Sequence, residues 1–136
     1  MKASLLCGLA LVLGLAAVPA LAHHSFAAEY DAAKPIAVTG TVTKVEWMNP
    51  HARFYIDVKD EGGKVTNWEF ELGSPNGLMR RGWTRNSLKE GDVITVNGSL
   101  AKDGSKLGNA RTVKLADGRN VFAGSASETG DEKAGK

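Results

Sequence analysis

The chain contains three histidines, and their placement suggests metal chemistry. His23 and His24 are adjacent and follow Ala20-Leu21-Ala22, whereas His51 ends the segment Trp47-Met48-Asn49-Pro50-His51. Imidazole nitrogen is a good ligand for copper, zinc and nickel, and Cu(II) heads the divalent affinity order. We therefore predict a transition-metal site made by His23, His24 and His51, with copper as the expected metal.

The chemistry of this site depends on where the chain is processed. If residues 1–22 are removed, the amine and imidazole of His23 can chelate one ion, and His24 or His51 can complete a three-nitrogen set. Cleavage after Ala20 is an alternative that leaves Leu21-Ala22-His23 at the terminus. This arrangement binds Cu(II) through the amine, two amides and the third-position imidazole. Either cut gives a copper site, but a different one.

Residues 1–22 have the layout of a secretory signal. Lys2 precedes an apolar run over residues 5–18, and Ala20-Leu21-Ala22 supplies the small residues of a cleavage site. The run is shorter than the roughly 20 residues that span a bilayer, so we expect a periplasmic or secreted bacterial protein without an integral membrane segment. The only cysteine, Cys7, leaves with the signal, so no intramolecular disulfide is expected.

A second set of residues suggests a different function. Trp47, Asn49, Arg53, Tyr55 and Glu69 are expected on one face next to the loop that carries His51. As an alternative to metal binding, that face could bind a small ligand, a glycan or a periplasmic partner protein. The nearly balanced charge gives no footprint for nucleic acid. The sequence also lacks common nucleophile, phosphate-loop and zinc-protease motifs, so we expect a carrier or sensor rather than an enzyme, with a copper-dependent redox enzyme as a third reading.

Alternation of apolar and polar residues predicts the strands that position these side chains. The first strand starts at Ile36 and bends near Thr43-Lys44, where the apolar residues change face. Residues 52–59 and 64–72 form a hairpin around Asp60-Glu61-Gly62-Gly63.

A short helix interrupts the strands. Ser74 is its predicted N-cap, Pro75 its first residue and Gly82 its end, with Leu78 and Met79 in the core and Trp83 as a lid. Strands follow at residues 93–100, with Ile94 and Val96 inward, and at 110–115 and 120–122.

This order predicts an all-β fold with one short helix, in the form of the five-stranded Greek-key barrel called the OB-fold. A half-open antiparallel barrel or sandwich is the alternative. The expected divisions are a cleaved signal peptide (1–22), an N-terminal segment (23–35), the β-barrel domain (36–122) and a disordered tail (123–136), which is too polar to pack.

Several motifs also resemble those of a family of small exported bacterial proteins described only as a domain of unknown function. They are His23-His24-Ser25-Phe26, Glu46-Trp47-Met48-Asn49-Pro50-His51, Ser74-Pro75-Asn76 with Arg81-Gly82-Trp83, Leu88-Lys89-Glu90-Gly91-Asp92 and Asp117-Gly118-Arg119. The resemblance extends from about His23 to Gly124. It implies the bacterial periplasmic setting and supplies no activity or catalytic residues.

Overall fold

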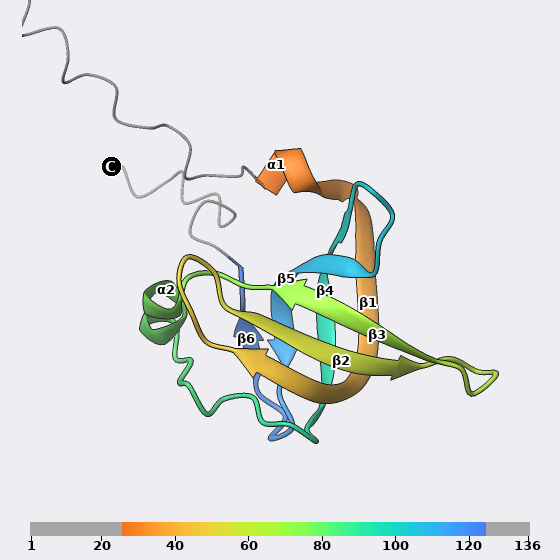
Figure 1. Ribbon diagram of the computed structural model, residues 1–136. Helices are drawn as coiled ribbons and strands as arrows, with labels where there is room; N and C mark the ends of the chain where they lie inside the picture. Colours follow the sequence, from red (N-terminus) through yellow and green to blue (C-terminus); the bar gives the residue numbers. More distant parts are fainter. Residues whose placement is uncertain (1–25, 125–136) are drawn as a thin grey trace, which may run out of the picture.

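The structure is a computed structural model that describes residues 26–124 (Figure 1). This part of the chain is mostly antiparallel β-sheet with little helix, which confirms the all-β prediction. Between residues 26 and 124, no helix is long and apolar enough to cross a membrane. The elements are α1 (Phe26–Glu29), β1 (Tyr30–Glu46), β2 (Arg53–Lys59), β3 (Val65–Glu71), α2 (Pro75–Arg80), β4 (Val93–Ala101), β5 (Leu107–Lys114) and β6 (Asn120–Phe122).

The long strand β1 is shared between two neighbours. Its first part pairs with β4, starting from Tyr30 opposite Ala101, and its last part pairs with β2, ending with Glu46 opposite Arg53. The strand begins at Tyr30 rather than at Ile36, where the apolar alternation begins. Strand pairing is made by backbone groups, so it continues beyond the residues whose side chains show the pattern.

The bend predicted near Thr43-Lys44 is confirmed, because the register between β1 and β2 shifts between Val42 and Lys44. Gly40 lies just before this bend, and a Cβ at that position would lie 2.6 Å from the backbone oxygen of Asp57. The absence of a side chain therefore lets β1 approach β2 closely. The bend turns β1 from β4 toward β2 and brings its end to the loop that carries His51.

Strands β2 and β3 form the predicted hairpin. Phe54 lies opposite Phe70 and Ile56 opposite Trp68, and all four are at most 9% exposed. The connecting turn ends with Gly63, whose φ of +84° is a conformation that glycine adopts readily. The pairing inferred from alternation is therefore confirmed.

The six strands lie in the order β3-β2-β1-β4-β5-β6, and β3 also pairs with β5. This additional pairing is parallel and joins residues 69–71 to residues 107–109. The end of β3 thus has hydrogen-bonded neighbours on both sides. Hydrogen bonds to β2 and β5 therefore hold the backbone of Glu71, the last residue of β3, from both sides.

The core lies between these strands and α2. The rings of Phe54 and Phe70 stack with their centroids 5.4 Å apart. As predicted, Ile94 and Val96 on β4 point inward. The buried cluster consists of Val42, Ala52, Phe54, Ile56, Trp68, Phe70, Leu72, Leu78, Trp83, Leu88, Ile94, Val96, Ala110, Val113, Leu115 and Ala123.

Helix α2 begins and ends close to its predicted bounds. The Ser74 hydroxyl accepts a hydrogen bond from the Gly77 backbone N–H at 3.2 Å, and Pro75 occupies the first turn. Leu78 is fully buried, but Met79 is 50% exposed, so its predicted core role is wrong. Consecutive helical residues point about 100° apart, and a helix of this length buries one face only.

Residues near the C-terminal end of the described region close the core. Trp83 is 3% exposed, as expected for a lid, and its indole N–H donates to the Phe122 carbonyl at 2.7 Å. Ala123 was expected to start a disordered tail, which is wrong for this residue: it is fully buried, and its N–H donates to the Arg111 carbonyl at 2.8 Å. Composition missed this position because its attachment is through the backbone. Residues 125–136 lie outside the described residues.

Candidate functional site

His51 lies in the loop between β1 and β2 and contacts the end of β3. Its Nδ1 is 2.9 Å from the carbonyl oxygen of Leu72. A carbonyl oxygen only accepts, so Nδ1 carries the hydrogen, and the Nε2 of the neutral ring keeps its lone pair. The side chain is 34% exposed. His51 therefore presents one nitrogen capable of binding a metal.

Backbone hydrogen bonds explain why this loop meets β3. The Ala52 N–H donates to the Gly73 carbonyl at 3.1 Å, and the Leu72 N–H donates to the Ala52 carbonyl at 2.9 Å. Within the loop, the Asn49–Pro50 peptide bond is cis. These contacts fix the residue after His51 against β3 and bring the imidazole to the Leu72 carbonyl.

Glu71 lies behind the imidazole. One carboxylate oxygen is 3.7 Å from the Nδ1 of His51, and the other is 3.4 Å from the Arg53 guanidinium. The side chain of Glu71 is only 12% exposed. A negative charge in this position favours hydrogen on Nδ1 and therefore the same tautomer that the Leu72 carbonyl selects.

Tyr30 lies close to this carboxylate. The residue is 2% exposed, and its hydroxyl makes no hydrogen bond of normal geometry in the described part of the chain, although the Glu71 carboxylate is near enough to act as an acceptor. Burial, followed by the negative charges of Glu71 and Glu29, raises the pKa of the Tyr30 hydroxyl well above its usual range. The hydroxyl is therefore a neutral, buried donor beside Glu71.

The N-terminal end of the described chain packs on Tyr30. The rings of Phe26 in α1 and Tyr30 in β1 have centroids 5.6 Å apart. Through Tyr30 and Glu71, the start of the described chain is thus connected to His51. The start of β1, the end of β3 and the loop that carries His51 therefore lie next to one another, although they are far apart in the sequence.

A network of charged side chains covers the adjacent strand face. Arg53 donates to Glu69 at 2.9 Å, and the Tyr55 hydroxyl donates to Glu46 at 3.3 Å. Hydrogen bonding from Lys44 lowers the pKa of Glu46 below its usual value. The polar groups on this face therefore form most of their hydrogen bonds and ion pairs with one another.

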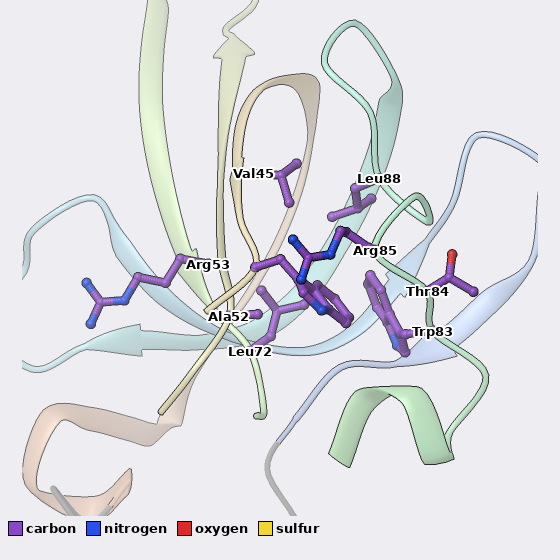
Figure 2. A pocket seen from close by; sticks show the side chains of 9 residues that line it. Val45, Ala52, Arg53, Leu72, Trp83, Thr84, Arg85 and Leu88 are labelled. Carbon is purple, nitrogen blue, oxygen red and sulfur yellow. The ribbon is translucent and has the colours of Figure 1, made fainter. Parts of the chain in front are cut away.

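A small depression, with a cavity volume of only about 10 Å³, lies beside the His51 loop (Figure 2). Its wall is mainly apolar, and Arg53 extends away from the other labelled side chains (Figure 2). It is therefore far smaller than the roughly 300–1,000 Å³ pockets that hold small molecules. The lining residues are Val45, Trp47, Ala52, Arg53, Leu72, Trp83, Thr84, Arg85 and Leu88.

Comparison with known families assigns the chain to a defined group. A family of unknown function, DUF6152, matches the chain over residues 11–110. The chain belongs to the DUF6152 family. The resemblance inferred from the sequence motifs is thereby confirmed at the level of the family. No curated protein matches the chain.

The DUF6152 region contains all the residues predicted for the site, but only some can be placed. His23 and His24 lie outside the described residues. Among residues 26–124, no group of three or more His, Cys, Asp or Glu side chains is arranged to hold a metal. A site that includes His51 consequently needs donors from elsewhere.

The residues predicted to form one ligand-binding face do not all lie together. Arg53, Tyr55 and Glu69 lie together on β2 and β3, because Tyr55 is opposite Glu69 and Arg53 is ion-paired with it. Trp47 joins Arg53 in lining the depression, whereas Asn49 is exposed in the loop. The strand residues therefore form a cluster, and the loop residues lie at its edge.

Sequence reasoning missed two partners of His51. Alternation with Phe70 and Leu72 predicts that Glu71 points outward from the strand, but gives no sign that it faces an imidazole. The carbonyl of Leu72 is a backbone group, so its role could not be recognised from the residue type. Register between β2 and β3 was the available signal, because it sets Arg53 opposite Glu71.

Proposed function

We propose that this DUF6152 protein is exported to the periplasm and binds a transition metal, expected to be Cu(II), as a carrier or sensor. The ligands are His23 with His24 and the loop residue His51. The observation that carries this proposal is the contact of His51 Nδ1 with the Leu72 carbonyl at 2.9 Å, which leaves Nε2 for a metal. Metal-binding histidines commonly donate their second ring N–H to a carbonyl or carboxylate in this way.

The position of the N-terminal end supports a joint site. Phe26 packs on Tyr30, and Tyr30 neighbours Glu71, which lies 3.7 Å from His51. His24 precedes Phe26 by two residues, so its Cα can be no farther than about 7 Å from that of Phe26. The joint site that we propose requires the chain before Phe26 to bring these histidines to His51.

The chemistry of the site depends on removal of the signal. A free amine on His23 adds a nitrogen donor that a longer chain holds in a peptide bond. An unperturbed α-amine has a pKa of about 8, so a strongly bound ion can displace its proton near neutral pH. Intact-mass analysis of exported protein tests this step: release at Ala22 supports a His23 amine ligand, whereas release at Ala20 supports the third-position histidine.

The metal proposal is tested by titrating correctly processed protein with Cu(II) and recording electron paramagnetic resonance. We expect nitrogen hyperfine structure at one equivalent, and a loss of at least one nitrogen donor in His51→Ala. His23→Ala and a form with extra residues before His23 separate imidazole from amine binding. Absence of a nitrogen-coordinated signal from the unmodified protein would rule out the proposed function.

We further propose that the sheet closes as an OB-fold-like five-stranded Greek-key barrel. The pairing of β3 with both β2 and β5, and the place of α2 between β3 and β4, support this topology. Nuclear Overhauser contacts between residues 69–71 and 107–109 test closure. Their absence would favour the half-open barrel or sandwich.

A second candidate function is binding of a small ligand, glycan or partner protein without a metal. It is supported by the mainly apolar depression that Trp47 and Arg53 help to line. Trp47→Ala should then abolish capture of the partner, and replacement of all three histidines should have no effect. The opposite pattern would exclude this candidate.

A further inference from the structure

Charge is unevenly divided along the described chain. Residues 26–74 contain eight Asp or Glu and five Lys or Arg, a net charge of −3, whereas residues 75–124 contain nine Lys or Arg and four Asp or Glu, a net charge of +5. The division is also spatial, because α2 and β6 lie toward one side of the molecule and the β2–β3 turn lies at the opposite side (Figure 1). The side that includes α2 and β6 is therefore the more basic one.

Four cationic side chains on this side are positioned around β6. The Arg81 guanidinium lies over the Phe122 ring, 4.4 Å from its centroid. Lys114 is opposite Asn120 in the β5–β6 pair, so it lies on the same face of the sheet as Phe122. The Trp83 indole donates to the Phe122 carbonyl and thus holds the segment after α2 against the same strand. The set, which we call the basic patch, consists of Arg80, Arg81, Arg85 and Lys114.

The basic patch has no acidic partner in the described part of the chain. None of its side chains forms an ion pair within residues 26–124, and the nearby carboxylate of Asp117 is bonded to Arg119. By contrast, Arg53 pairs with both Glu69 and Glu71 on β3, and the two acidic residues of segment 59–64 are balanced by two lysines. The acidic regions are thus largely neutralised within the chain, so a second copy does not supply the missing counter-charge.

An exposed apolar side chain accompanies these cations. Met79 directly precedes Arg80 and is 50% exposed, whereas its neighbour Leu78 is fully buried. Apolar side chains flanked by Lys or Arg are typical of protein surfaces that rest in the headgroup region of a bilayer. A soluble acidic partner would use the charges alone, so the exposed methionine favours a lipid surface.

We propose that the basic patch and Met79 dock the protein onto an anionic phospholipid surface. The cations of the patch bind headgroup phosphates, and Met79 enters the boundary between headgroups and acyl chains. Each cation near such a surface improves binding about fivefold, so four together give a gain on the order of several hundredfold. The β2–β3 turn then points away from the membrane. This docking goes beyond metal binding and does not depend on it.

Co-sedimentation with vesicles tests the proposal. The processed protein is used, because the apolar residues 5–18 would bind vesicles by themselves. Vesicles made of equal parts of phosphatidylcholine and phosphatidylglycerol are compared with vesicles of phosphatidylcholine alone, at low and at physiological salt. The double variant Arg80→Gln, Arg85→Gln is matched by Lys59→Gln, Lys64→Gln, which makes the same change in net charge at the β2–β3 turn. All four residues are exposed.

We expect the unmodified protein to bind only the anionic vesicles, and to bind them less tightly as salt rises. The arginine double variant should bind about 25-fold more weakly, and the lysine double variant within about twofold of the unmodified protein. Met79→Ala should weaken binding about three- to tenfold. Its control is Val65→Ala, which removes a similarly exposed apolar side chain beside Lys64 and should have no effect.

Three results would each overturn the proposal. The first is absence of binding to the anionic vesicles at low salt. The second is an equal loss in the arginine and lysine double variants, which would mean that net charge rather than the basic patch governs binding. The third is unchanged vesicle binding by Met79→Ala together with efficient displacement by soluble polyglutamate, which would assign the patch to an acidic macromolecule. Thermal unfolding of each variant verifies that it is folded.

Discussion

Replacing Tyr30 by phenylalanine should stabilise the protein. The residue is 2% exposed and its hydroxyl has no described partner, and burying such a group costs about 1–3 kcal/mol. The phenyl ring would keep its contact with Phe26, whose centroid lies 5.6 Å away. After allowing for the small void left by the oxygen, we expect a gain of about 1 kcal/mol. For a domain of this size, that gain raises Tm by about 4–8 °C.

The same substitution should change the dependence of stability on pH. Burial and the charges of Glu71 and Glu29 raise the pKa of Tyr30 above its ordinary value of 10.0. As pH rises past that value, the unfolded chain loses the phenolic proton whereas the folded chain retains it. The unfolded state then binds fewer protons, so stability falls with rising pH. One such group contributes a slope of up to about 1.4 kcal/mol per pH unit, which Tyr30→Phe removes.

Urea unfolding followed by tryptophan fluorescence measures both effects, at about pH 8 and again near pH 11. The advantage of Tyr30→Phe over the unmodified protein should be larger at the higher pH. Tyr55→Phe is the control, because its hydroxyl already donates to Glu46 at 3.3 Å and its loss should be neutral or slightly destabilising. A Tyr30→Phe protein that is less stable by about 1 kcal/mol at pH 8 would refute the reasoning, since it would mean that the hydroxyl is hydrogen-bonded.

Three further predictions concern the scaffold, and thermal or urea unfolding measures each. Gly98→Ala should destabilise the protein by about 3 kcal/mol or more, because a Cβ there would lie 1.9 Å from a backbone oxygen of β5; an unchanged Tm would contradict this close approach. Leu78→Ala should cost about 2–5 kcal/mol, whereas Met79→Ala should change stability by less than about 0.5 kcal/mol, and equal effects would contradict the observed burial. Removing residues 123–136 should lower Tm more than removing residues 125–136, because only the longer deletion removes the buried Ala123. Equal effects would argue against a structural role for Ala123 and Gly124.

The regular parts of the fold were predictable because their signals are local. Alternation identifies β2 and β3, and the change of apolar face locates the bend that the register shift at Val42 confirms. Ser74 and Pro75 mark the start of α2 through residue chemistry alone. Met79 was misplaced because a short apolar pair does not reveal which member faces the core.

The site was less predictable, because its decisive contacts are formed between distant segments. The sequence identified His51 as a candidate ligand, but the acceptor for its Nδ1 is a backbone oxygen on β3. The position of Glu71 behind the imidazole follows from strand register and loop placement together. Nothing in the local sequence around Tyr30 shows that its hydroxyl is buried beside Glu71.

The position of His51 depends on a series of backbone hydrogen bonds that reaches the last described residues. Ala123 accepts from the Gly73 N–H at 2.8 Å, and Gly73 accepts from the Ala52 N–H at 3.1 Å. Ala52 in turn accepts from the Leu72 N–H, and the Leu72 carbonyl accepts from His51. The Leu72 carbonyl, which bonds His51, therefore belongs to a segment that is held by backbone hydrogen bonds at both Ala52 and Ala123. The buried Ala123 therefore helps to hold the backbone segment against which the His51 loop packs.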